Sequence, residues 1–126
     1  MLRWRGQRRR STVVGTPRRD VLRGGPGDDT IFGLGGNDEI LGGGGNDEVC
    51  SGKGNDRLLG GDDDDRLLGG EGKDVLHGGA GGDVLEGLLG DDKLDTRDGV
   101  RENDTADGGP GQDVCKTNPL DERIRC

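Results

Sequence analysis

A strict nine-residue period is the feature that most constrains how this chain folds. From Gly24 to Asp95 the sequence is eight copies of one nonapeptide, joined end to end. The copies are GGPGDDTIF, GLGGNDEIL, GGGGNDEVC, SGKGNDRLL, GGDDDDRLL, GGEGKDVLH, GGAGGDVLE and GLLGDDKLD. Their common form is G-G-x-G-x-D-x-U-x, where U is a large aliphatic residue. A fixed short period of this kind predicts a stacked-repeat architecture.

Two places in the repeat never change in character. The sixth place is always Asp, and the eighth is always Ile, Val or Leu. The sixth-place residues are Asp29, Asp38, Asp47, Asp56, Asp65, Asp74, Asp83 and Asp92. The eighth-place residues are Ile31, Ile40, Val49, Leu58, Leu67, Leu76, Leu85 and Leu94. The rest of the repeat is dominated by Gly, which turns require wherever φ is positive.

The repeat predicts an all-β fold, a right-handed parallel β-roll (a β-solenoid). The first six residues form a turn and the last three a short strand. Side chains alternate between the faces of a strand, so the eighth place alone has to be apolar. Two nonapeptides then make one coil of a flat solenoid, and residues eighteen apart stack. The sixth-place Asp residues therefore fall into two columns, one of which begins at Asp29 and the other at Asp38.

We expect one domain with three parts. Residues 1–10 form a basic disordered arm. The β-roll covers residues 11–116, with regular repeats at 24–95 and degenerate edge repeats at 11–23 and 96–116, where Asp104 and Asp113 keep the Asp phase. Residues 117–126 show no repeat and form a C-terminal tail or cap, because terminal repeats of solenoids are usually atypical.

The gapless run of G-G-x-G-x-D units resembles the RTX (hemolysin-type) calcium-binding repeat family. This resemblance implies that Ca²⁺ ions sit between vertically adjacent turns. Each ion would be held by the two sixth-place Asp carboxylates that flank it and by backbone carbonyls of the Gly-rich segments. The eight sixth-place Asp residues are the predicted ligands, and they give about six full sites, three in each column.

Electrostatics supports a cation in the columns. Carboxylates stacked at the strand spacing of about 4.8 Å repel one another, and a hard dication that takes oxygen ligands removes this repulsion. The eight aliphatic residues form too thin a core to order a Gly-rich chain, so calcium binding should drive folding. Without metal, the acidic and Gly-rich composition favours disorder.

Some repeats depart from the consensus and should bind calcium less well. Leu34 and Leu88 replace the second Gly, Ser51 replaces the first, and Asp63 replaces the fourth. The fourth place is expected to need a positive φ, which Asp tolerates better than most residues. The edge repeat at 11–23 carries Arg where the family has Gly, so we expect it to cap the solenoid.

Charge and composition limit the partners. The net charge is −8, but residues 1–19 contain seven Arg and no acid, and the rest has 11 basic against 26 acidic residues. The acidic part argues against nucleic acid and for cations. We expect no membrane span and a secreted, extracellular protein, although no signal peptide is recognisable. A protein or cell-surface partner stays open.

The chain has three Cys residues. Cys115 and Cys126 bracket a short polar tail that contains a turn signal at Asn118–Pro119. A disulfide between them would hold the tail over the last coil, which also fits a resemblance to extracellular actinobacterial members of the RTX family. The alternative is two unpaired thiols. Cys50 is then left over, without a partner in this sequence.

No catalytic constellation stands out, so we expect no enzymatic activity. His77 is the sole His and falls in an outward place, and paired carboxylates of a glycosidase would not be repeated eight times. Two alternatives to a free calcium-binding β-roll remain. One is a detached secretion or stabilising module of a larger secreted enzyme. The other is an adhesive or interaction solenoid that uses the outward stacks Phe32–Cys50–Leu68 and Leu41–Leu59.

Overall fold

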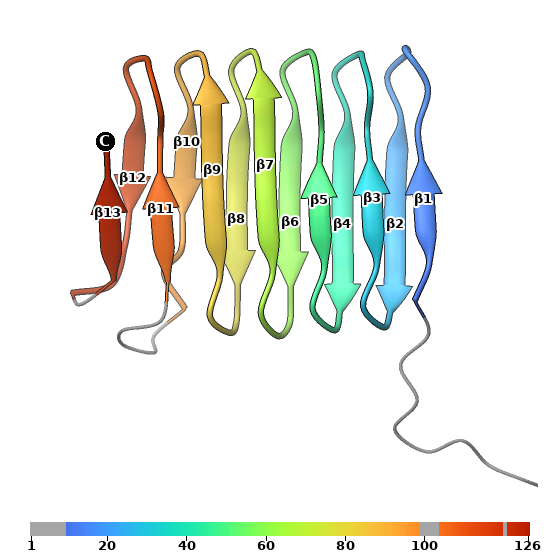
Figure 1. Ribbon diagram of the computed structural model, residues 1–126, viewed down its shortest axis with the longest axis horizontal. Helices are drawn as coiled ribbons and strands as arrows, with labels where there is room; N and C mark the ends of the chain where they lie inside the picture. Colours follow the sequence, from blue (N-terminus) through green and yellow to red (C-terminus); the bar gives the residue numbers. More distant parts are fainter. Residues whose placement is uncertain (1–9, 99–103, 120) are drawn as a thin grey trace, which may run out of the picture.

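The protein is an all-β solenoid of parallel strands (Figure 1). A computed structural model describes residues 10–98, 104–119 and 121–126. The arm predicted at residues 1–10 therefore lies outside the described residues, apart from Arg10. Among the described residues no helix is present that is long and apolar enough to span a membrane.

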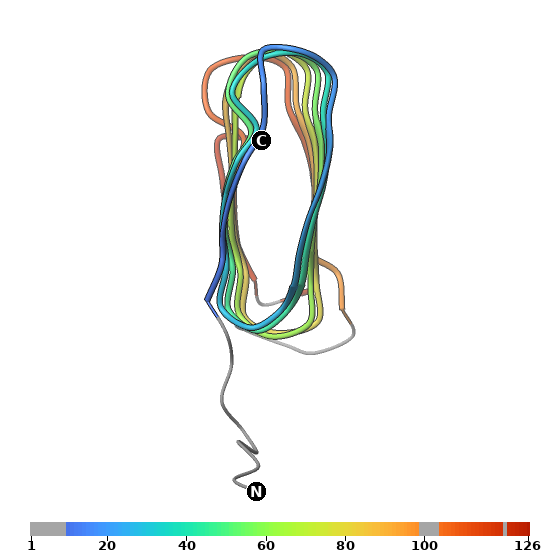
Figure 2. The same cartoon turned by 90° about the vertical axis from the view of Figure 1, so that its right-hand side faces the viewer.

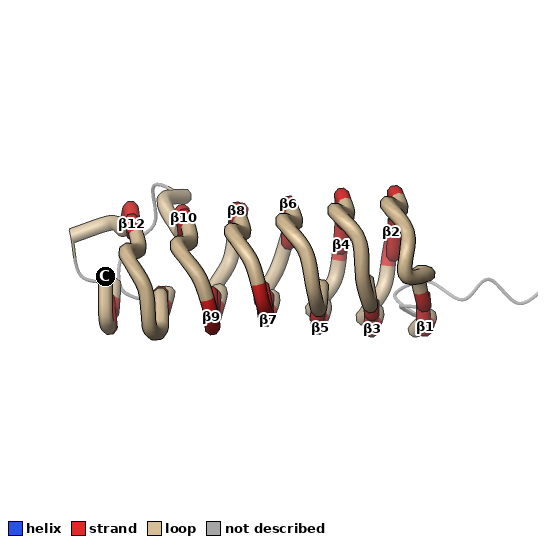
Figure 3. The backbone as a smooth tube through the Cα atoms, turned by 90° about the horizontal axis from the view of Figure 1, so that it is seen from above, coloured by secondary structure: helices blue, strands red, loops and turns tan. Residues whose placement is uncertain are grey.

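Odd-numbered and even-numbered strands form two separate sheets (Figures 1 and 3). The first sheet has the order β1 (Thr12–Val14), β3 (Thr30–Phe32), β5 (Glu48–Cys50), β7 (Arg66–Glu71), β9 (Val84–Leu89), β11 (Thr105–Asp107) and β13 (Glu122–Ile124). The second has the order β2 (Val21–Pro26), β4 (Glu39–Gly44), β6 (Arg57–Gly61), β8 (Val75–Gly79), β10 (Lys93–Asp95) and β12 (Val114–Lys116). Seen along the long axis, successive coils superimpose on one flattened outline (Figure 2). The predicted β-roll is confirmed.

The register confirms that each coil contains two nonapeptides. Glu39 of β4 lies opposite Arg57 of β6, and Glu48 of β5 lies opposite Arg66 of β7, so the partners are eighteen residues apart. A nine-residue coil would instead have placed Glu39 beside Glu48. The Arg66 guanidinium also forms an ion pair with Glu86 of β9, at 3.1 Å between Nη2 and Oε2.

The core is a thin double row of aliphatic side chains between the two sheets. All eight eighth-place residues are buried, with exposed fractions of at most 1%. The rows continue beyond the regular repeats, through Val13 and Leu22 at one end and Ala106 and Cys115 at the other. Because neighbours in a strand point to opposite faces, one apolar residue per strand fills this core.

The C-terminal tail adds a strand where no repeat was expected. Strand β13 pairs in parallel with β11 and places Glu122 opposite Thr105. An extended segment needs no Gly-Asp motif to pair with a free sheet edge, because the pairing uses backbone groups. The sequence pattern therefore carried no signal for this strand.

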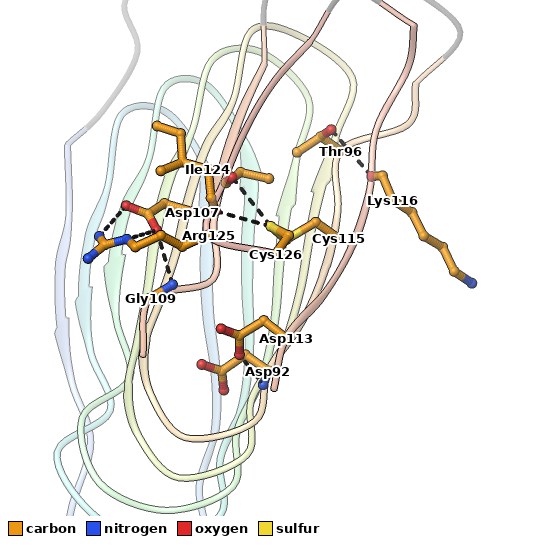
Figure 4. The surroundings of a disulfide bond; sticks show 11 residues. Asp92, Thr96, Asp107, Gly109, Asp113, Cys115, Lys116, Ile124, Arg125 and Cys126 are labelled. Atoms are coloured by element: carbon orange, nitrogen blue, oxygen red, sulfur yellow. Dashed lines mark hydrogen bonds and ion pairs between the residues drawn. A yellow bond between two sulfur atoms is a disulfide. The ribbon is translucent and has the colours of Figure 1, made fainter. Parts of the chain in front are cut away.

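A disulfide bond joins Cys115 of β12 to Cys126, with their Cα atoms 5.6 Å apart (Figure 4). This pairing confirms the predicted link. Cys115 takes the eighth place of its strand, opposite Leu94 of β10. The bond therefore ties the end of the chain to the last core position of the second sheet. Cys50 is a free, half-buried thiol.

Neighbouring leucines of β6 test the core assignment. Leu58 is fully buried, whereas Leu59 lies in the outward ninth place and is half-buried. We expect Leu58→Ala to lower the free energy of unfolding by about 2–5 kcal/mol, because it leaves a cavity. Leu59→Ala should cost about 1 kcal/mol or less. Urea unfolding in saturating calcium measures both changes. Equal losses of unfolding free energy would contradict the assignment of Leu58 to the core and Leu59 to the outer face.

Candidate metal centre

The Gly-rich half of each repeat is a turn that depends on left-handed backbone conformations. The second and fourth residues of all eight repeats have positive φ values. Three of these sixteen residues are not Gly: Leu34, Asp63 and Leu88, with φ values of 75°, 72° and 74°. The expectation that the fourth place needs a positive φ is confirmed at Asp63. The two Leu residues adopt a conformation that is costly for a bulky side chain.

The sixth-place Asp residues form the two predicted columns, and all eight are buried with exposed fractions of at most 3%. In each column, Oδ1 of one Asp accepts a hydrogen bond from the backbone N–H of the Asp one coil earlier. The N–H of Asp29 donates to Asp47, for example, and that of Asp47 donates to Asp65, both at 2.8 Å. One carboxylate oxygen of every Asp is thus used to hold adjacent coils in register.

The other carboxylate oxygen, Oδ2, is buried and has no hydrogen-bond partner in any of the eight residues. The first-place residue shows where this oxygen points. A Cβ atom built on Gly42 would lie 2.5 Å from Asp47 Oδ2 and 2.6 Å from the carbonyl oxygen of Gly60, one coil further on. A side-chain oxygen and a backbone oxygen therefore converge on one small space between two coils, and the same arrangement recurs along both columns.

Burial raises the pKa of several of these carboxylates. Desolvation is the largest cause, and neighbouring Asp charges add to it. Together they raise the pKa of Asp65 to about 8 and the pKa of both Asp74 and Asp83 to about 7. The pKa of Asp47 and that of Asp92 rise to about 6 for the same reason. A buried anion without a partner is costly, so the columns call for a positive charge.

The donor set fits a hard cation. Ca²⁺ binds carboxylate and backbone carbonyl oxygens and takes six to eight of them. Among the described residues, no three His, Cys, Asp or Glu side chains come together around one point. The space beside Gly42 instead combines a carboxylate oxygen of one coil, Asp47 Oδ2, with the backbone carbonyl oxygen of Gly60 in the next coil. This combination suits calcium better than zinc, which prefers nitrogen and sulfur ligands.

Comparison with protein-family models decides the family. The RTX calcium-binding nonapeptide repeat (4 copies) matches residues 14–49, 51–76 and 68–101, which is more than half of the chain. The chain belongs to the RTX repeat family. Neither curated proteins nor solved structures gave a significant match. RTX repeats bind calcium, and the family is structural rather than catalytic.

The RTX columns extend further than the sequence analysis assumed. Asp104 Oδ1 accepts the N–H of Asp83 at 2.7 Å, and Asp113 Oδ1 accepts that of Asp92 at 2.8 Å (Figure 4 shows the second bond). Both residues also keep a buried Oδ2 without a hydrogen-bond partner. They were predicted in phase but not as ligands; the Gly pattern is depleted before Asp104 and complete before Asp113.

The fifth place of the repeat, which is variable in the consensus, also joins adjacent coils by hydrogen bonds. Its Asn and Asp side chains form an outer ladder, in which each Oδ1 accepts the backbone N–H of the fifth-place residue one coil later. Asp28 accepts from Asn46, and Asn46 accepts from Asp64, at 2.8 and 3.0 Å. The recurrence of Asn and Asp at this place was the available signal, since both side chains bond readily to nearby backbone groups.

Ser51 and Asp20 show how RTX turns depart from the common arrangement. Ser51 is fully buried at a first place, and its hydroxyl donates a hydrogen bond to the carbonyl of Gly69 in the next coil. Asp20, at the N-terminal end, has its carboxylate bonded to Thr16: the N–H donates at 2.6 Å and the hydroxyl at 3.0 Å. A carboxylate that is satisfied in this way fits the expected capping role of residues 11–23.

The first-place space is tested by two Gly residues of one repeat. Gly42→Ala places a methyl group between the oxygens of Asp47 and Gly60, so we expect a higher calcium midpoint of folding. Gly44→Ala is the matched control, because a Cβ there meets nothing within 4 Å. Calcium titrations followed by circular dichroism compare the two variants. Superimposable titrations would show that the space at Gly42 is not used for binding.

The pKa shifts also predict opposite pH dependences with and without metal. Without calcium, the raised pKa values of Asp65, Asp74 and Asp83 mean that the folded chain binds more protons than the unfolded chain, whose Asp pKa lies near 3.8. Stability of the metal-free fold should therefore fall as pH rises from about 4 to about 8. With calcium, stability should rise over the same range, because the ligands must be ionised.

Circular dichroism of calcium-free and calcium-saturated protein at several pH values measures the direction in which stability changes with pH. A metal-free β signal that grows from pH 5 to pH 8 would contradict the assignment of the buried carboxylates.

Proposed function

We propose that this protein is an extracellular calcium-dependent β-roll that folds when calcium binds between its coils. The proposal rests on one observation: every sixth-place Asp keeps a buried Oδ2 that no hydrogen bond satisfies. When bound, calcium supplies the positive charge that these oxygens lack. The residues proposed to hold it are the eight sixth-place Asp residues together with Asp104 and Asp113, with first-place backbone carbonyls.

The number of sites follows from the columns. Asp104 and Asp113 repeat the hydrogen-bond pattern of the regular repeats. The columns then run from Asp29 to Asp104 and from Asp38 to Asp113, with four intervals in each. We therefore propose up to four ions per column, rather than the three expected from the regular repeats alone.

Conditions outside the cell suit such a protein. Extracellular calcium modules bind with Kd values of about 10⁻⁴–10⁻³ M. A chain with these affinities would stay unfolded at cytosolic calcium levels and fold after export. The Cys115–Cys126 disulfide also favours an oxidising compartment, and RTX repeats are typical of secreted proteins.

A calcium titration with two Asp variants tests the ligand assignment. Asp47 lies mid-column between Asp29 and Asp65, so it should serve two ions. Asp62 is an exposed third-place residue. Both changes to Ala remove one negative charge, so their difference separates coordination from bulk electrostatics. We expect Asp47→Ala to raise the calcium midpoint and lower cooperativity, at a cost of about 2 kcal/mol or more.

Asp62→Ala should change the free energy of folding by no more than about 0.5 kcal/mol, so its calcium midpoint should stay close to that of the wild type. If wild-type protein shows the same far-ultraviolet spectrum in chelator and in millimolar calcium, calcium-driven folding is refuted. If the wild type responds but the two variants titrate alike, the ligand assignment is refuted.

A further inference from the structure

The C-terminal tail places another carboxylate in line with the first Asp column. Strand β13 pairs with β11, and the N–H of Glu122 donates to the carbonyl of Asp104 at 2.9 Å. The same bond joins Glu48 to Asp29 in the regular repeats. Asp121 therefore takes the position after Asp104, although no G-G-x-G-x-D motif precedes it.

Two buried carboxylate oxygens at this end of the column have no hydrogen bond. Asp104 has an exposed fraction of 2%, and its Oδ2 has no hydrogen-bond partner. In the repeats, Oδ2 and a carbonyl oxygen of the following coil converge on one space, as Asp47 Oδ2 and the Gly60 carbonyl do beside Gly42, and the coil that follows Asp104 is the tail. Oδ1 of Asp121 is also buried and accepts no hydrogen bond. Each of these oxygens is a buried acceptor without a hydrogen bond, like the Oδ2 atoms of the sixth-place Asp residues in the columns.

The Asp121 carboxylate is held in place through its other oxygen. Oδ2 accepts the backbone N–H of Asn118 at 2.7 Å and the Thr96 hydroxyl at 3.3 Å, and Thr96 is fully buried. In the regular column Oδ1 accepts a hydrogen bond from the N–H of the preceding Asp, whereas Oδ1 of Asp121 accepts none. The side chain is thus fixed while one oxygen stays available to a ligand.

Charge gathers at the same place. Asn118 links two acidic residues: its backbone N–H donates to Asp121 Oδ2 at 2.7 Å and its Nδ2 donates to Asp98 Oδ1 at 2.8 Å. Burial, followed by the charges of Asp121 and Asp98, raises the pKa of Asp104 to about 6. The disulfide from Cys126 to Cys115 restrains the segment that carries Asp121, which lowers the entropic cost of ordering it.

We propose that Asp104 and Asp121 hold a hard divalent cation, calcium, in a site that the non-repeat tail completes. The proposal rests on the proposed function, because it extends the same ligand to a position outside the repeats. Calcium takes six to eight oxygens, so backbone and water oxygens complete the shell. In this site the tail is a ligand-bearing cap that binds an ion of its own.

Ion counting on the intact, disulfide-bonded chain tests the proposal. Isothermal titration calorimetry with calcium chloride compares wild type, Asp121→Asn and Asp62→Asn. The two variants lose the same charge, but Asp62 is an exposed third-place residue. We expect Asp121→Asn to bind one calcium fewer than wild type and Asp62→Asn to bind the wild-type number. An unchanged number in Asp121→Asn overturns the proposal.

A measurement on the wild type covers the case in which Asp121→Asn does not fold. Crystals grown in calcium should give an anomalous difference peak between the carboxylates of Asp104 and Asp121. Peaks in the repeat columns with none at this position overturn the tail site but leave the proposed function intact. A wild type that binds no calcium in either experiment refutes the proposed function itself.

Discussion

The structure depends on how one oxygen atom in each repeat, Oδ2 of the sixth-place Asp, is neutralised. Every sixth-place Asp uses Oδ1 to hold the coil before it and leaves Oδ2 buried without a hydrogen bond. An ionised carboxylate that is buried in that position without a partner destabilises the fold. Under the proposed function, the β-roll is stable when a cation, or at low pH a proton, neutralises the columns.

The glycines follow from the same constraint. A methyl group at the first place would occupy the space where the Asp47 and Gly60 oxygens converge. Position 42 therefore requires Gly for lack of space. At the second and fourth places the reason is conformational, because φ is positive. Ser51, Leu34 and Leu88 show that the fold tolerates exceptions: the Ser51 hydroxyl donates a hydrogen bond to the Gly69 carbonyl, and the two Leu residues keep the positive φ.

Much of this architecture was predictable because the repeat encodes it eight times. The eighteen-residue register, the burial of Leu58 and the column that contains Asp47 all follow from the side-chain period and the position of Gly. Strand β13 and the alignment of Asp121 were not predictable, because edge pairing uses backbone groups and leaves no motif. The positive φ of Leu34 and Leu88 was likewise hidden, since the sequence shows the departure from Gly but not that the backbone keeps its conformation. The bonding of the Ser51 hydroxyl depends on a neighbour eighteen residues away.

Residue-resolved hydrogen exchange tests the dependence on calcium most directly. The backbone N–H groups of the sixth-place Asp residues bond to carboxylates of the next coil, so their protection reports whether the columns are formed. At pH 8 we expect strong protection of the Asp29, Asp47 and Asp65 amides in millimolar calcium and rapid exchange in chelator. Equal protection in both conditions would contradict the account, because it would show that the buried carboxylates are tolerated without a cation.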